Sequence, residues 1–267
     1  QKIAEAVGFI SAVVVSSVSG KVKKIEPRVT AGCAKSISIV IENDGLYTAV
    51  EGLGEDRDAT KLSKQEIRDI VREAGIVGLG GAGFPTNVKL TPKDESKIDY
   101  VIVNGAECEP YLTCDYRMMI EEPERLVGGL KVMLQLFENA KAVIGIENNK
   151  PKAIEKLRAL VKDEPKITVE PLRTKYPQGG ERSLIYAVTG REINSSMLPA
   201  DAGCVVDNVN TVMAIYDAVC KQTPILERVI TVTGDAVKEP QNFKVRTGMN
   251  YNDIIEAAGG FVGEPKK

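Results

Sequence analysis

The chain has 267 residues, an apolar fraction of 43% and a formal net charge of −2. This length fits one large domain or two to three small ones, and the near-neutral charge argues against a nucleic-acid partner. Because no apolar run approaches the ~20 residues that cross a bilayer, we expect no membrane span. The sequence shows no signal peptide and starts at Gln1, so we expect the natural N-terminus to lie upstream.

The absence of histidine is the strongest chemical constraint on this chain. It excludes Ser-His-Asp and Cys-His nucleophile systems and histidine-ligated metals. An odd number of cysteines with no Cys-x-x-Cys pair indicates reduced thiols and predicts no metal site. The cysteines are Cys33, Cys108, Cys114, Cys204 and Cys220. Any chemistry must therefore use carboxylates, amides, thiols, lysines or a cofactor.

Residues 1–48 are expected to form a small β unit. Short runs of β-branched and apolar residues predict strands at 10–15, 20–25 and 36–41. The unit looks incomplete at its N-terminal end, which is why we treat it as part of a larger domain.

A capped helix is expected next, over 64–74. Ser63-Lys-Gln-Glu66 is a capping box, and the apolar residues that follow recur with helical spacing. Gly75 stands where a helix C-terminal glycine belongs.

The glycine-rich stretch 75–86 is the most informative part of the sequence. Gly78-x-Gly80-x-x-Gly83 matches the dinucleotide-binding fingerprint, but that fingerprint should follow a strand, and a helix precedes it here. Consecutive glycine amides can still cradle a phosphate. The pattern therefore favours a nucleotide or flavin site of another design, with an ordinary glycine-rich turn as the alternative.

Strands and helices alternate through the central region, which we delimit as 49–225. Strands are predicted at 100–103, 142–146 and 167–169, and helices at 122–139, 151–162, 181–189 and 211–220. This alternation predicts an α/β fold with a largely parallel, Rossmann-like sheet. Ligands of such sheets bind at the carboxyl ends of the strands.

A β-rich unit is expected to complete the chain over 226–267. Strands are predicted at 228–234 and 243–246, and a short helix at 251–258. A unit of this size should depend on packing against the central domain.

Polar side chains and glycines concentrate in the segments 75–86, 104–115, 176–182 and 205–210. Their amides and carboxylates could bind a flavin, and Lys89 its phosphate. Each segment has a structural alternative. Asn104-Gly105 could be a turn, Asp207-Asn208 a helix cap, Phe84 a core residue, and Glu107 and Glu109 solvated carboxylates.

Together these segments resemble a known family. In chain order they read Gly78-Leu-Gly-Gly-Ala-Gly-Phe-Pro-Thr86 with Lys89, Asn104-Gly-Ala-Glu-Cys-Glu-Pro110, Tyr176-Pro-Gln-Gly-Gly-Glu181 and Val206-Asp-Asn208. The order resembles the flavin subunit of respiratory complex I and, more closely, the RnfC component of the Rnf electron-transport complex. That resemblance implies a partial barrel-sandwich unit at the N-terminus and an SLBB-like β-grasp domain at the C-terminus.

The resemblance also implies a set of binding residues. FMN phosphate and ribityl contacts would come from Gly78, Gly80, Gly81, Lys89 and Asn104. The flavin pocket would be completed by Tyr176, Gly179, Val206 and Asn208. Phe84 would stack on the nicotinamide dinucleotide, with Glu109 and Glu181 at its polar groups. The complex I pattern differs by an arginine at Leu79, acids at Ala106 and Gly180, and an amide at Asp207.

The implied function is oxidation of NADH, or reduction of NAD, by a flavin module in which the cofactors rather than catalytic side chains make and break bonds. Implied cofactors are FMN and NAD(H), with two 4Fe-4S clusters in a later region whose cysteine motifs this sequence does not contain. Implied partners are other Rnf subunits, and ferredoxin through one of them, at the cytoplasmic face of the membrane. The alternatives are an RnfC-like cobalamin reductase and a non-catalytic ligand-binding or assembly module.

Overall fold

The computed structural model describes residues 1–30, 32 and 34–264, and Cys33 lies outside them. Its centre is a four-stranded sheet in the order β7-β6-β5-β8, with every neighbouring pair parallel. The strands are β5 (Tyr100–Gly105), β6 (Lys141–Glu147), β7 (Ile167–Leu172) and β8 (Cys204–Asn208). The expected α/β class is confirmed. The strand β8 was not expected, because its apolar run is short and its polar end looks like a helix cap.

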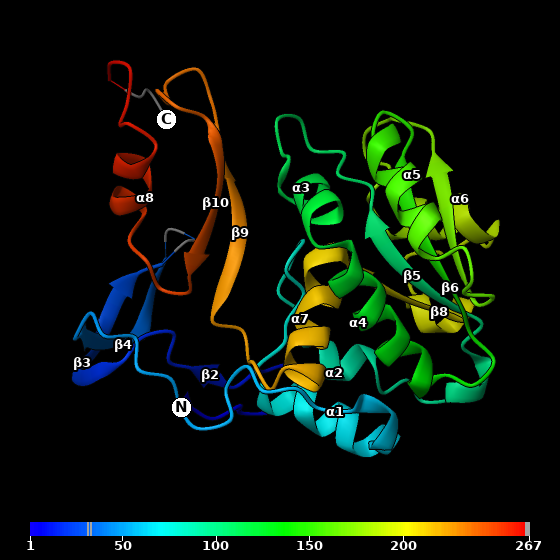
Figure 1. Cartoon of the computed structure of the whole chain (residues 1–267), viewed down its shortest axis with the longest axis horizontal. Coiled ribbons are helices and arrows are strands. Elements are labelled where there is room, and N and C mark those ends of the chain that lie inside the picture. The colour runs from blue at the N-terminus through cyan, green and yellow to red at the C-terminus, as the bar shows by residue number, and fades with distance from the viewer. Residues whose placement is uncertain (31, 33, 265–267) are drawn as a thin grey trace.

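Helices cover both faces of this sheet (Figure 1). They are α3 (Cys114–Glu121), α4 (Pro123–Leu136), α5 (Pro151–Leu160), α6 (Glu181–Thr189) and α7 (Val209–Cys220). The expected helix over 122–139 is shorter at both ends. Pro123 disfavours helical backbone at Glu122 and separates α3 from α4, and the extended backbone of Phe137 ends α4 at Leu136. The helix α3 itself was missed by the sequence-based prediction.

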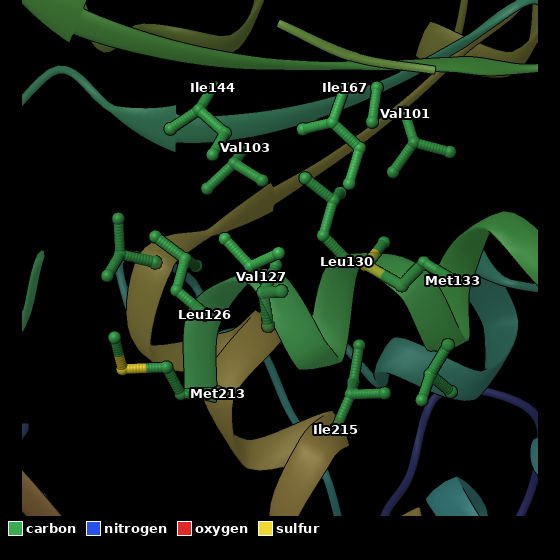
Figure 2. Packing of buried hydrophobic residues seen from close by; sticks show 14 of the residues in the cluster. Val101, Val103, Leu126, Val127, Leu130, Met133, Ile144, Ile167, Met213 and Ile215 are labelled. Atoms are coloured by element: carbon green, nitrogen blue, oxygen red, sulfur yellow. The ribbon is translucent and has the colours of Figure 1, made fainter. Parts of the chain in front are cut away.

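The main core lies between the sheet and the helices α4 and α7. Leu126, Leu130 and Met133 on one face of α4 pack beneath Val101 and Val103 of β5, as Figure 2 shows. The α4 side chains and these valines are all 0% exposed. Full burial of such a side chain stabilises the fold by roughly 1.5–3 kcal/mol, so this layer fixes the sheet edge that carries the polar segments.

The helix before the glycine-rich stretch forms as expected. In α1 (Lys64–Glu73) the side chains of Ser63 and Glu66 complete the capping box. Gly75 has φ 68°, and a Cβ there would lie 2.6 Å from the Val13 carbonyl oxygen, so both backbone and packing require glycine. Short helical segments occupy Thr86–Lys89 (α2), Ala59–Lys61, Glu95–Lys97 and Pro199–Ala202.

Two small β units flank the central domain. The N-terminal one pairs β1 (Lys2–Ala4) with β2 (Val14–Val15), and β3 (Gly20–Val29) with β4 (Lys35–Asn43). The expected strand over 10–15 was wrong for 10–13, where Ile10 is exposed and forms no ladder.

The C-terminal unit pairs β9 (Glu227–Val232) with β10 (Gln241–Arg246), followed by α8 (Tyr251–Ala257). In Figure 1 this unit and the β3–β4 hairpin stand on one side of the central sheet. Among the described residues, no helix is both long and apolar enough to cross a membrane.

Candidate functional site

Two asparagines lie side by side at the point where the strand order of the sheet reverses. The chain runs from β5 outward through β6 and β7, then returns to add β8 on the other side of β5. Asn104 of β5 and Asn208 of β8 are register partners at the carboxyl ends of these parallel strands. Open α/β sheets bind ligands at such a switch point, so the topology makes this edge a candidate site.

Asn104 joins the β5 strand end to the loop before α6. Its Nδ2 donates to the Gly179 carbonyl at 2.8 Å, and its Oδ1 accepts from the Ala106 amide at 3.2 Å. The Gly179 amide donates to Cys108 Sγ at 3.4 Å. A Cβ on Gly179 would lie 2.3 Å from the Ala106 carbonyl oxygen, so only glycine allows this approach. The turn interpretation of Asn104-Gly105 is wrong, because both residues continue β5.

Asn208 is both a helix cap and part of a partly buried amide network. Its Oδ1 accepts from the Asn210 amide at 2.9 Å and caps α7, so the cap interpretation is confirmed. Its Nδ2 donates to Asp115 at 2.6 Å, and Asn210 Nδ2 donates to the other oxygen of the same carboxylate at 2.6 Å. Burial raises the pKa of Asp115, while these two donors and the charge of Arg228 act to lower it. Both the oxygen and the nitrogen of the Asn208 side-chain amide are therefore fixed by hydrogen bonds.

The glycine loop lies against Asn208. The Gly78 amide donates to the Phe84 carbonyl at 2.9 Å, which closes the loop, and the Leu79 amide donates to Thr211 Oγ1 at 2.9 Å. A Cβ on Gly80 would lie 2.6 Å from Asn208 Nδ2.

The next part of the loop presents backbone to solvent. Residues 80–83 are exposed, and within the described ranges their amides donate no hydrogen bond inside the chain. A Cβ on Gly81 would meet nothing within 4 Å, which leaves open space above that position. Consecutive exposed amides of this kind form an anion-binding surface.

Lys89, at the end of α2, reaches the carboxyl end of β8. Its Nζ donates to the Val206 carbonyl at 2.8 Å and lies 3.5 Å from Asp207 and 3.6 Å from Glu181. Asp207 is 1% exposed, and neither carboxylate oxygen has a hydrogen-bond partner among the described residues. Burial raises the pKa of Asp207 to about 6, against the opposing charge of Lys89. A second polar group, Gln178 Oε1, is buried beside Gly179 and likewise has no partner in the described part of the chain.

The remaining candidate residues lie at the exposed rim. Tyr176 donates its hydroxyl to Glu109 at 3.2 Å, and this bond raises the pKa of Tyr176. Both side chains are exposed. Phe84 is half-buried at the end of the glycine loop, and no hydrogen bond among the described residues ties that loop to the Tyr176–Glu109 pair.

Sequence reasoning missed part of the network. Asp115 and Asn210 lie in the polar segments 104–115 and 205–210, but no role was predicted for either residue. The helix α3 was not predicted, although an acid in a first helical turn is a usable signal. Arg228 lies in none of the polar segments. Glu107 is not a solvated carboxylate, since it is 9% exposed and accepts from the Asp115 amide at 2.9 Å.

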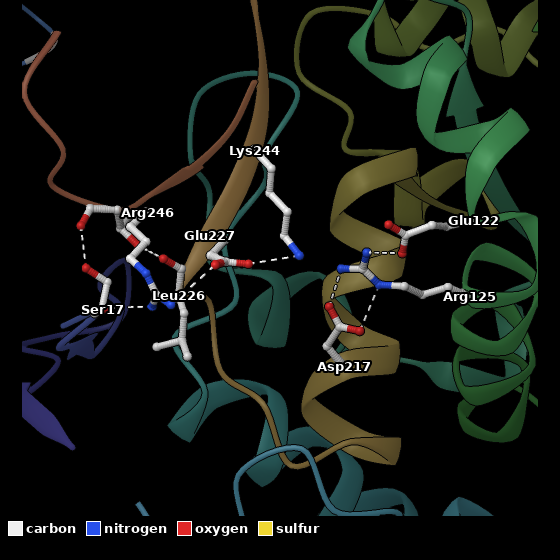
Figure 3. Close-up of polar contacts among 9 residues, drawn as sticks. Ser17, Glu122, Arg125, Asp217, Leu226, Glu227, Lys244 and Arg246 are labelled. Atoms are coloured by element: carbon white, nitrogen blue, oxygen red, sulfur yellow. Dashed lines mark hydrogen bonds and ion pairs between the residues drawn. The ribbon is translucent and has the colours of Figure 1, made fainter. Parts of the chain in front are cut away.

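A cavity of about 1100 Å³ lies beside the switch point, between the central domain and the two flanking units. Ion pairs project into it from opposite walls, Lys244–Glu227 on the C-terminal unit and Arg125–Asp217 between α4 and α7 (Figure 3). Among the described residues, the candidate site borders this cavity at its edge, through Leu79, Asn210 and Arg228. We place the site at the strand ends rather than in the cavity, because the buried polar network is there.

Comparison with known families gives matches to three successive segments. Residues 71–217 match the Nuo51 FMN-binding domain, 1–46 the RnfC barrel sandwich hybrid domain, and 229–267 the SLBB domain.

Among curated proteins, the C subunit of the proton-translocating ferredoxin:NAD(+) oxidoreductase complex of Clostridium ljungdahlii is 48% identical over the whole chain, which covers 58% of that protein. The C subunit of the Na(+)-translocating complex of Acetobacterium woodii is 45% identical, again over the whole chain, with 60% of that protein covered. The chain thus spans somewhat more than half the length of these relatives.

Among solved structures, an air-oxidized NAD+-reducing NiFe hydrogenase gives a TM-score of 0.65 at 25% identity, over 79% of this chain and 41% of the other. Its H2-reduced form gives a TM-score of 0.63 at 22% identity, over 78% and 41%.

Proposed function

Because the chain belongs to the family of the Nuo51 FMN-binding domain, and its relatives are C subunits of ferredoxin:NAD(+) oxidoreductase complexes, we propose that it is an FMN-binding module that exchanges electrons with NAD(H). The observation that carries this proposal is the meeting of Asn104 and Asn208 at the switch point, beside the exposed amides of the glycine loop.

The residues present fit a flavin mononucleotide. Amides 80–83 and Lys89 offer donors and positive charge for the phosphate. The unpartnered Gln178 amide oxygen and the Asp207 carboxylate are polar atoms that a ligand could satisfy, because buried polar groups normally have partners. Asn104, Gly179 and Asn208 would form the wall beside the ring and ribityl chain. Val206 would contribute backbone, since its side chain is buried in the core.

Bound FMN supplies hydride and single-electron chemistry, and the chain's own residues bind, orient and exclude water. The ammonium group of Lys89 offsets the negative charges of Asp207 and Glu181. Tyr176 at the rim is proposed to complete the flavin pocket. Phe84, Glu109 and Glu181 are proposed to orient NAD(H). This division of labour suits a chain without histidine, because alignment rather than a side-chain acid or base then determines the rate.

The onward path of electrons is a further part of this proposal. The names of the relatives include ferredoxin as a reaction partner, and the family resemblance implies iron–sulfur centres on the way to it. Both would be reached through other parts of the complex. The module would then work as a peripheral subunit at the cytoplasmic face of the membrane.

Flavin titration followed by anaerobic reduction tests this proposal. The purified 267-residue chain, reconstituted with FMN, should retain one flavin per chain after desalting, and NADH should bleach its visible absorbance. Free FMN mixed with NADH and a heat-denatured sample are the controls. A folded protein that retains no flavin would overturn the proposal, whereas bound flavin that NADH does not bleach would overturn only its NAD(H) part.

A further inference from the structure

Arg228, on the strand β9, places its guanidinium group against the glycine loop. Arg228 Nη2 donates to the Leu79 carbonyl at 3.0 Å, immediately before the exposed amides 80–83. Arg228 is exposed, and it forms no ion pair with any residue that the structure describes. A guanidinium has five N–H donors, so one bond to a neutral carbonyl leaves most of its donors available to a ligand.

A second set of contacts holds β9 beside the same site. The Thr113 amide donates to Thr231 Oγ1 at 3.1 Å, and Thr113 Oγ1 donates to Asn242 Oδ1 at 3.1 Å. Thr113 directly precedes α3, which carries Asp115. The charge of Arg228 also acts to lower the pKa of Asp115.

We infer that the C-terminal unit is part of the flavin site, with Arg228 supplying positive charge to an anionic phosphate on the glycine loop. This inference rests on the proposed function. The guanidinium reaches the Leu79 backbone from 149 residues further along the chain, so the docking of β9 brings it to the loop. Phosphate binding and docking of β9 are therefore coupled, since each places Arg228 on the loop.

Paired titrations with FMN and riboflavin test the role of Arg228, because riboflavin lacks the phosphate. Arg228→Gln should weaken FMN binding about tenfold, the size expected for one charge-assisted hydrogen bond, and leave riboflavin binding unchanged. Lys244→Gln removes one positive charge from the adjacent strand, where Lys244 pairs with Glu227, and should change neither affinity. Arg228→Lys should restore part of the lost FMN affinity. The defect should shrink at high salt, because exposed charges are screened.

Hydrogen exchange tests the coupling. FMN should slow amide exchange in β9 of the unaltered chain and not in Arg228→Gln, while riboflavin should slow it in neither. Unchanged FMN affinity in Arg228→Gln would overturn the inference. An equal loss of FMN and riboflavin affinity would also overturn it, because Arg228 would then only hold the loop in shape. If the unaltered chain binds neither flavin, the proposed function itself fails and this inference fails with it.

Discussion

Replacing Gly80 with alanine should damage the site, whereas the same change at Gly81 should not. A Cβ on Gly80 would lie 2.6, 2.7 and 2.8 Å from Nδ2, Cγ and Cβ of Asn208, about 0.8 Å short of an ordinary 3.4 Å contact. Asn208 cannot turn aside freely, because it caps α7 and donates to Asp115. Losing the cap costs about 1 kcal/mol, and breaking the bond to a buried carboxylate costs roughly 1.5–3 kcal/mol.

The strain has two ways to relax, and both can be measured. If Asn208 moves, the free energy of unfolding of Gly80→Ala should fall by about 2.5–4 kcal/mol. If the exposed loop moves outward instead, stability should change little, but the displaced amides should lower FMN affinity by about tenfold or more. Urea unfolding and fluorescence titration with FMN distinguish the two. Gly81→Ala is the matched control, because a Cβ there meets nothing within 4 Å. If both variants match the unaltered protein in stability and affinity, the close packing of Gly80 on Asn208 is refuted.

Two more substitutions test the buried parts of the site. Gly179→Ala places a Cβ 2.3 Å from the Ala106 carbonyl oxygen, so it should lower the free energy of unfolding by about 1–3 kcal/mol and abolish FMN retention; unaltered urea midpoint and flavin content would contradict this. Burial raises the pKa of Asp207 to about 6 in the folded chain, from an ordinary 3.8, so folding favours the protonated carboxyl and stability falls as pH rises through that window. The stability of Asp207→Asn relative to the unaltered chain should therefore increase by up to about 3 kcal/mol from about pH 4 to above pH 6. Urea unfolding across that pH range measures this difference. If the stabilities of the two proteins change in parallel with pH, the pKa of Asp207 is not raised by burial.

Local pattern determined the elements that depend on neighbours in the chain. The Ser63–Glu66 capping box and Gly75 fixed the ends of α1, because capping bonds and left-handed backbone involve only residues a few positions apart. The alternation of apolar strands and helices likewise determined the parallel sheet. The ordered glycine, asparagine and glutamate motifs identified the family, which the comparisons confirm.

Tertiary structure alone decided which distant groups meet. The sequence places Asn104 and Asn208 more than a hundred residues apart, and only the order β7-β6-β5-β8 makes them register partners at one edge. Asp115 and Arg228 gained their roles in the same way, through contacts that no local periodicity encodes. The glycine loop shows the same difference between sequence and structure. The number of glycines predicts that backbone lies close to another group, but only the packing distinguishes the crowded Gly80 from the open Gly81. Short-range hydrogen bonds can be read from residue order, whereas a binding site made by strand order and domain docking depends on the whole fold.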